Sequence, residues 1–280
     1  MALRSYFHST FDPRRIPGLQ AWYDAADSAS ITLDAGRVSQ WSDKSGKARH
    51  ATNTTSGSTQ PSYTTAGRNG LNVLTFAAAS VQRLTVPSST VAFNYLHNGT
   101  ESYVVAVSVY GTVANPLAVY GLFGNDASSS ATPGVFVLYQ DTGGGSPNDA
   151  LRIDITAGSG VVPANSLNAA NNAVLSNNFN LAPATTVVVQ EYTLDADNAT
   201  ASQRTRIRAK GGTEVASNNK TATPSTGNAG FDFQLGATGN NVLPLQGDIC
   251  ELMFFSQLPT TTARDLIRRY LGSKWGVSVG

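Results

Sequence analysis

Short apolar runs recur along the chain between clusters of Gly, Asn, Ser, Thr and Pro. Residues 151–155 alternate apolar and polar positions, which is the period of a strand with one buried face. Residues 103–110 and 134–139 are apolar almost throughout, as is typical of strands buried on both faces. The other predicted strands are residues 71–76, 185–192, 231–235 and 249–255. These runs of β-branched and aromatic residues between turns predict an all-β protein, an antiparallel two-sheet β-sandwich.

A helical period stands out only near the C-terminal end, in residues 260–272. The apolar positions that share one face of this predicted helix are Ala263, Leu266, Ile267, Tyr270 and Leu271. A threonine at its start can cap the free N–H groups, and Gly272 suits the left-handed position that ends a helix. We expect Arg264, Arg268 and Arg269 to lie on the solvent side.

The sequence predicts a short arm, residues 1–14, followed by one sandwich domain, residues 15–280. No shift in composition divides the second part. The aromatic residues of the arm are Tyr6, Phe7 and Phe11. Because such side chains are costly to expose, the arm is either a frayed terminus or a segment that docks on a neighbouring molecule. Residues 157–180 form a long low-complexity stretch, either a functional surface loop or one with a short hidden element.

The charge composition excludes several classes of protein. Lys and Arg number 19 against 18 Asp and Glu, and charged residues make up only 13%, about half the usual share. A net charge of +1 lacks the basic excess of a nucleic-acid binder. No run approaches the ~18 apolar residues of a membrane span. The first residues lack a secretory signal, so we expect synthesis in the cytoplasm. Cys250 is the single cysteine and is expected to pack as a small hydrophobe.

The residues that carry chemistry are sparse. The three histidines, His8, His50 and His97, are isolated, and neither a His-Glu-x-x-His nor a Gly-x-Ser-x-Gly motif occurs. We therefore predict that the protein is not an enzyme and has no cofactor, with calcium as the exception to consider. Its weak candidate ligands are Asn125, Asp126 and Asp141. We interpret them first as turn residues that hydrogen-bond to their own backbone.

One strand carries a cationic stripe. At a period of two, residues 203–210 place Arg204, Arg206, Arg208 and Lys210 on one face, opposite Thr205, Ile207 and Ala209. This face either grips an anionic partner or simply discourages edge-to-edge aggregation, and we favour the second interpretation. Tyr120 and Tyr139 are candidate loop aromatics for stacking on a sugar. The tryptophans Trp22, Trp41 and Trp275 could do the same, but we expect them to close the core.

Two segments at opposite ends of the chain carry a family resemblance. The first comprises residues 16–27 (IPGLQAWYDAAD) and 38–46 (VSQWSDKSG), with short matches at 50–52, 60–63 and 69–76. The second comprises residues 245–255 (LQGDICELMFF) and 270–276 (YLGSKWG). Together they resemble the laminin-G-like, concanavalin A-like jelly-roll domains found in bacterial surface proteins and phage virion proteins.

The resemblance implies a sandwich in which early and late strands pair. It also implies that Trp41, Asp43 and Gly46 form a turn with a buried anchor and that Glu251 is a scaffold residue. From it we expect a non-enzymatic protein on the surface of a phage particle, a capsid decoration or a tail adhesin, made in the host cytoplasm. Its partners would be other virion proteins, a second copy of the chain or a cell-surface glycan. The alternatives are a carbohydrate-binding module of a bacterial surface protein and, third, a glycoside hydrolase, which would need two facing carboxylates.

For the partner-binding residues we expect the aromatic arm and the cationic stripe, namely Tyr6, Phe7, Phe11, Arg204, Arg206, Arg208 and Lys210. For glycan binding we expect Tyr120 and Tyr139.

Overall fold

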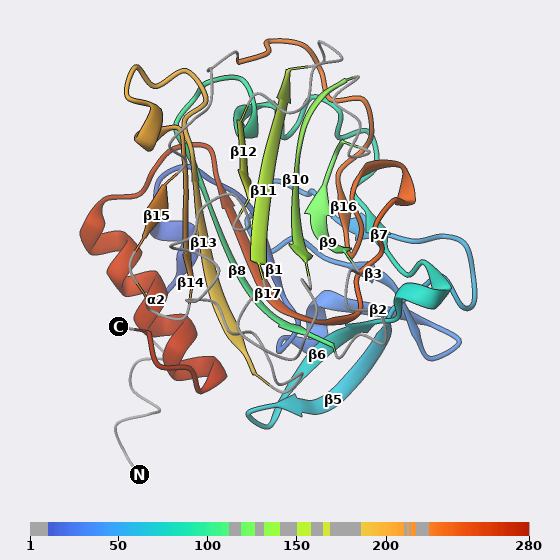
Figure 1. Ribbon diagram of the computed structural model, residues 1–280. Coiled ribbons are helices and arrows are strands. Elements are labelled where there is room, and N and C mark those ends of the chain that lie inside the picture. The colour runs from blue at the N-terminus through green and yellow to red at the C-terminus, as the bar shows by residue number, and fades with distance from the viewer. Residues whose placement is uncertain are drawn as a thin grey trace.

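The computed structural model describes residues 11–111, 119–126, 132–140, 150–157, 165–168, 186–209, 212, 214–216 and 224–279. Their strands form one 17-stranded sheet that bends into facing layers, with helix α2 (Thr261–Trp275) on the outside (Figure 1). The predicted all-β antiparallel class with a C-terminal helix is thereby confirmed. No helix in these ranges is long and apolar enough to cross a membrane.

One layer is built around two long central strands, β8 (Ser102–Tyr110) and β17 (Gly247–Phe255). On the β8 side follow β13 (Val188–Leu194), β14 (Thr205–Ala209) and β15 (Val215–Ala216). On the β17 side lie β1 (Leu19–Asp24) and β6 (Leu71–Phe76). β1 pairs with β17 from Leu19 opposite Phe255 to Asp24 opposite Glu251, so early and late strands pair as the resemblance implies.

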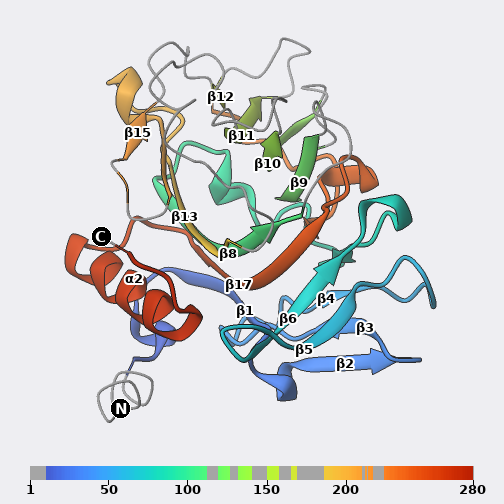
Figure 2. The same cartoon turned by 60° about the horizontal axis from the view of Figure 1, so that its bottom comes forward.

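The facing layer is made of β12 (Asn165–Asn168), β11 (Ala150–Ala157), β10 (Pro133–Gln140), β9 (Val119–Gly124), β16 (Gln234–Leu235) and β7 (Leu84–Thr85). The N-terminal strands β2 (Ile31–Asp34), β3 (Arg37–Trp41), β4 (Ala51–Thr52) and β5 (Ser62–Arg68) connect the two layers. β4 pairs with β7, β5 pairs with β6, and β3 pairs with both β4 and β5. Figure 2 shows these strands below β17 and β9–β12 above it.

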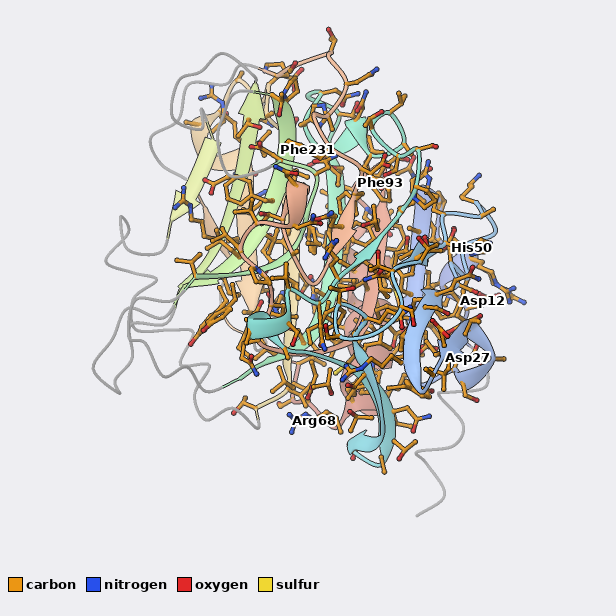
Figure 3. All side chains as sticks on the ribbon, turned by 90° about the vertical axis from the view of Figure 1, so that its right-hand side faces the viewer. Asp12, Asp27, His50, Arg68, Phe93 and Phe231 are labelled. Carbon is orange, nitrogen blue, oxygen red and sulfur yellow. The ribbon has the colours of Figure 1, made fainter. Side chains whose placement is uncertain are left out.

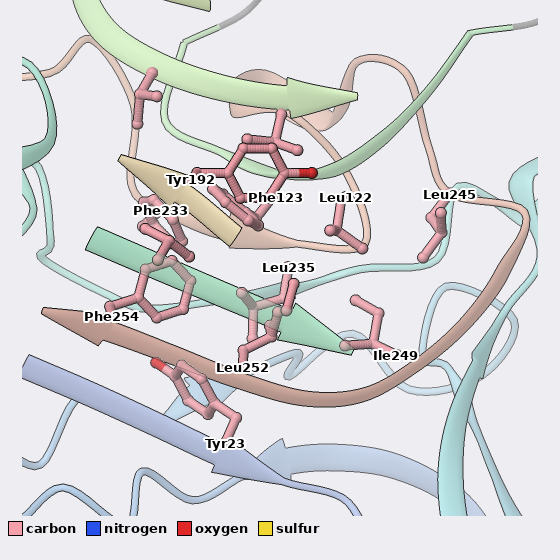
Figure 4. Close-up of a cluster of buried hydrophobic side chains, with 14 of the residues drawn as sticks. Tyr23, Leu122, Phe123, Tyr192, Phe233, Leu235, Leu245, Ile249, Leu252 and Phe254 are labelled. Atoms are coloured by element: carbon pink, nitrogen blue, oxygen red, sulfur yellow. The ribbon is translucent and has the colours of Figure 1, made fainter. Parts of the chain in front are cut away.

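The main core lies between the layers (Figure 4). Its centre is a group of aromatic rings in which Phe254 of β17 meets Phe123 and Phe233 edge-on, at centroid distances of 5.2 and 5.3 Å. The edge-on geometry is a favourable one for aromatic pairs. The predicted strand at residues 231–235 is wrong in its first part, since only Gln234–Leu235 is strand. The Phe233 N–H donates a hydrogen bond to the Ser89 hydroxyl oxygen, in a loop, instead of to a carbonyl oxygen of a neighbouring strand.

Helix α2 covers the outer face of β1, β17, β8 and β13 and forms a second apolar cluster with it (Figure 2). Its start is as predicted, because the Thr260 hydroxyl accepts a hydrogen bond from the Ala263 N–H at 3.2 Å. Its end is not: the helix runs to Trp275, and Gly276, at φ 71°, takes the left-handed position. Gly272 stays inside the helix, where a Cβ would lie 2.7 Å from the Val277 carbonyl oxygen.

The expectation that Arg268 faces solvent is also wrong. Arg268 is buried, and its Nε lies 2.8 Å from Glu191 Oε1 on β13. The Tyr103 hydroxyl donates to the other oxygen of Glu191 at 2.7 Å. A strong helical period cannot distinguish an exposed arginine from one that meets a carboxylate on the sheet beneath.

A buried ionic cluster ties the helix to the sheet. The Glu251 carboxylate accepts hydrogen bonds from the indole N–H groups of Trp22 and Trp275, each at 2.9 Å. Lys274 Nζ lies 2.8 Å from Glu251 Oε2 and 2.6 Å from Asp24 Oδ1. Burial raises the pKa of Glu251, and the neighbouring Lys274 opposes that rise. The scaffold role expected for Glu251 is therefore confirmed.

The core-closing role expected for the tryptophans is confirmed as well. Trp22, Trp41 and Trp275 are all buried. Cys250 is also fully buried and unpaired, as predicted.

Candidate functional site

The cationic stripe has the predicted alternation. On β14, Thr205, Ile207 and Ala209 point inward, and Arg206 and Arg208 lie on the other face. Arg206 Nη2 lies 3.1 Å from Glu101, and its Nη1 lies 3.5 Å from Glu214. Arg208 Nε lies 4.0 Å from Glu191. Carboxylates of the same chain therefore face both strand arginines.

The two ends of the stripe lie outside the strand. Arg204 precedes β14 and donates to the Asn198 carbonyl oxygen at 2.7 Å. Lys210 lies outside the described residues. Partner binding by this face stays a prediction.

The aromatic candidates are placed differently from the expectation. Tyr6 and Phe7 lie outside the described residues, whereas Phe11 packs on Tyr270 of α2 at a ring distance of 4.9 Å. Tyr120 and Tyr139 lie opposite each other on β9 and β10, not in loops. Tyr139 stacks on Tyr110 at 4.4 Å and is only 5% exposed, so in this conformation it offers no platform for a sugar.

The calcium candidates do not form a site in the described part of the chain. Asn125 and Asp126 are fully buried, and Asn125 Oδ1 accepts a hydrogen bond from the Val135 N–H at 2.8 Å. Asp141 lies outside the described residues. Among the described residues, no group of three His, Cys, Asp or Glu side chains could hold a metal ion.

A polar groove runs over β4 and β7, where the N-terminal strands meet the second layer. It consists of two adjoining hollows, with volumes of about 200 and 470 Å³, that share Thr52 and Pro87. The smaller hollow is also lined by Asn53, Thr54, Thr55, Arg83, Thr85 and Asp232. The larger is also lined by Gln40, Lys47, Ala48, Arg49, His50, Val86, Ser88, Ser89 and Ala92. In Figure 3, His50 lies on the N-terminal part of the chain, beside the segment that carries Phe93.

One wall of the groove is held by the predicted turn. The Asp43 carboxylate accepts hydrogen bonds from the N–H groups of Trp22, Ser45 and Arg49, at 2.9, 2.8 and 3.0 Å. The Asp43 N–H in turn donates to His50 Nδ1 at 3.1 Å. Since Nδ1 accepts, Nε2 of the neutral ring carries the proton and can donate it to a ligand. The turn with a buried anchor expected at Trp41, Asp43 and Gly46 is thus confirmed, and Asp43 orients His50.

The opposite wall is a loop held by Asp232. Its two carboxylate oxygens accept hydrogen bonds from the N–H groups of Ser88 and Ser89, at 3.1 and 2.6 Å. Both walls contain a residue with left-handed backbone, Ala48 at φ 57° and Ser88 at φ 56°. Non-glycine residues in this region carry strain of about 1–3 kcal/mol. Seven other described non-glycine residues share this conformation, so it does not by itself distinguish the groove.

The groove is positively charged. Arg83, Lys47 and Arg49 line it, and in the described part of the chain none of them has a carboxylate at ion-pair distance. Burial lowers the pKa of Arg83, and no acidic group offsets this effect. The Arg49 guanidinium lies 5.2 Å from the centre of the Phe93 ring, and its Nη1 donates to the Gln20 carbonyl oxygen at 3.2 Å.

Sequence reasoning did not identify this groove. In the sequence, His50 is an isolated histidine, and Arg49 and Arg83 belong to no motif. A signal was present, because residues 38–46 and 50–52 belong to the segments that carry the family resemblance, and they supply one wall. The other wall comes from residues 83–89 and 232, which no local motif links to them.

The chain matches no protein-family model, and no curated protein matches it. Among solved structures it is similar to domain 4 of AbnA, an extracellular GH43 arabinanase from Geobacillus stearothermophilus, in complex with arabinotriose. The TM-score is 0.54 at 14% identity, over 90% of this chain and 99% of that one. The Ruminococcus gnavus IT-sialidase CBM40 bound to α2,3-sialyllactose gives a TM-score of 0.40 at 12% identity, over 61% and 82% of the two chains.

The NanB sialidase of Streptococcus pneumoniae gives a TM-score of 0.44 at 14% identity, over 68% of this chain and 26% of that chain. At these identities a likeness shows the fold alone. This chain accordingly has a jelly-roll β-sandwich fold that resembles domain 4 of the arabinanase over nearly its whole length.

Proposed function

We propose that the protein is a carbohydrate-binding module and that the polar groove over β4 and β7 is its binding site. The observation that carries the proposal is the lining of this groove. Sugars present many hydroxyl groups, and the groove offers matching amide, hydroxyl and imidazole groups from Gln40, Thr52 and His50. Gln40 and Thr52 stand on strands, and His50 stands on the turn held by the buried Asp43 carboxylate, so their positions are set before a ligand arrives.

The fold supports the same proposal. Domain 4 of the arabinanase, which shares the fold over nearly its whole length, was solved with a bound arabinotriose. The lining of the groove suits binding rather than hydrolysis. Glycosidases commonly place two carboxylates about 5–10 Å apart across the scissile bond, whereas among the described residues Asp232 is the one carboxylate that lines the groove.

Binding can be tested on a glycan array, followed by titration calorimetry with the strongest ligand. Thr52 is shared by both hollows, so Thr52→Val should weaken binding about three- to tenfold through the loss of one hydrogen-bonding hydroxyl. His50→Ala should do the same. The matched control is Thr65→Val, an exposed residue of β5 outside the groove, which should leave the affinity unchanged. If the array binds nothing, or if all three variants bind alike, the groove is not a sugar site.

A place on the surface of a phage particle remains a second proposal, based on the resemblance alone. The structural relatives named above are glycosidases or modules of them, and they lend it no support. Co-purification of the protein with assembled particles would support it, and recovery of the free protein only would oppose it.

A further inference from the structure

Positive charge lies at both ends of the groove. Arg83 belongs to the smaller hollow, and Lys47 and Arg49 belong to the larger one, with Thr52 and Pro87 between them. Most other described cations are neutralised within the chain: Lys44, Arg68, Arg152, Arg206, Arg208, Arg268 and Lys274 all have carboxylate partners. The groove therefore brings together three cations that have no carboxylate partner among the described residues.

Among the described residues, Asp232 is the one carboxylate that lines the groove, and it offsets only part of the charge of Arg83, Lys47 and Arg49. Both oxygens of Asp232 are engaged by the N–H groups of Ser88 and Ser89. The Nη1 group of Arg83 donates to the Val81 carbonyl oxygen at 3.0 Å and makes no described ion pair. The whole chain carries a formal charge of only +1, so the groove is more positive than the average surface. Such a concentration of one sign in a hollow attracts ligands of the opposite sign.

We infer that the groove takes an acidic oligosaccharide, whose carboxylates pair with Arg83 at one end and with Lys47 and Arg49 at the other. This inference rests on the proposed function and names the class of sugar. An arginine fork can hold a carboxylate with two parallel hydrogen bonds, which a neutral sugar cannot supply. The Arg49 guanidinium is held in place by Phe93 and the Gln20 carbonyl oxygen before a ligand binds.

The test uses the full chain and one pair of matched probes, hexagalacturonate and its fully methyl-esterified form. The two share a backbone and differ in charge. We expect the acid to bind about tenfold more tightly than the ester at low ionic strength. Because the pairing is partly exposed, the difference should shrink at about 0.15 M salt. A hyaluronan octasaccharide serves as a second acidic probe with a different backbone.

Variants that remove one positive charge test whether the acidic probe binds in the groove. Arg83→Gln and Lys47→Gln should each weaken binding of the acidic probe about tenfold and leave the ester unchanged. The matched control is Arg269→Gln, an exposed arginine on α2, which should change neither. Binding of hyaluronan alone, with the same losses in the variants, also supports the inference.

Three results overturn the inference. If acid and ester bind equally, or only neutral glycans bind, the groove is a sugar site without preference for charge, and the proposed function stands. If no glycan of either kind binds, both proposals fail. If Arg269→Gln weakens binding of the acidic probe as well, the preference for acid depends on the overall charge of the protein and not on the cations of the groove.

Discussion

The buried ionic cluster beneath α2 allows a quantitative test of the fold. Lys274→Met removes an ammonium group that lies 2.6 Å from Asp24 and 2.8 Å from Glu251 while keeping a similar apolar stem. Asp24 keeps Lys44 at 3.0 Å, but Glu251, whose side chain is fully buried, loses its cation and keeps only hydrogen bonds. Breaking a buried ion pair in this way costs about 3–5 kcal/mol in the free energy of unfolding.

The loss in unfolding free energy caused by Lys274→Met should decrease as the pH is lowered. Burial holds the pKa of Glu251 in the folded protein above its ordinary value of 4.5. At a pH between the ordinary pKa and the folded pKa, the folded state therefore binds the proton more readily than the unfolded state. Stability from this group therefore rises as pH falls through the folded pKa toward 4.5. Without Lys274 the folded pKa rises further. The loss in unfolding free energy caused by Lys274→Met should consequently be largest near pH 8 and clearly smaller at about pH 5.

Urea unfolding followed by tryptophan fluorescence is the suitable assay, because Trp22 and Trp275 both contact Glu251. Arg269→Met, on the exposed side of the same helix, is the control and should change the unfolding free energy by less than about 0.5 kcal/mol. A loss below about 1 kcal/mol for Lys274→Met near neutral pH would refute the reasoning, because it is the value of an exposed pair. An equal loss at both pH values would also refute it.

Four further predictions concern other parts of the fold. Arg268→Ala leaves the buried carboxylate of Glu191 without its closest cation, and urea unfolding should show a loss of about 3 kcal/mol. Gly247→Ala, at φ 147°, would bring a Cβ to 2.1 Å from a carbonyl oxygen of the neighbouring strand and should cost about 3 kcal/mol or more. Gly36→Ala, at φ 82° with open space around it, should cost only about 1 kcal/mol. Burial lowers the pKa of His97, so the folded protein resists its protonation and stability should fall as pH drops below 6.5. In His97→Gln that part of the pH dependence should disappear, and an unchanged slope between about pH 7 and 5 would contradict the assignment.

The local features of the fold were predictable because they depend on local periodicity. Alternation along residues 205–209 records which face of β14 is buried, and the strand has that orientation. Along residues 151–155 the apolar positions are buried as predicted, but Asp154 on the opposite face is fully buried as well, so the prediction of a single buried face is wrong there. The helix was predictable for the same reason, although its end was not. Gly272 has the chemistry of a helix end, but the chain after α2 packs so closely on it that glycine is needed inside the helix.

The candidate site was less predictable, because its residues are brought together by pairing of distant strands. The stripe at residues 204–210 was visible because its charges are close in sequence, yet its strand arginines face carboxylates from elsewhere in the chain. The groove was hidden, since Arg83, His50 and Asp232 become neighbours only when β4 pairs with β7 and β7 pairs with β16.

The sequence by itself determined the class of fold, the burial of its tryptophans and the turn at residues 41–46, because each depends on hydrophobic period or on a contiguous motif. Only the tertiary structure decided which charges are neutralised and which remain available. Whether Arg268 or Arg83 finds a carboxylate depends on residues far away in the chain. The energy of a charge is set by its surroundings in space, and a linear pattern does not record them.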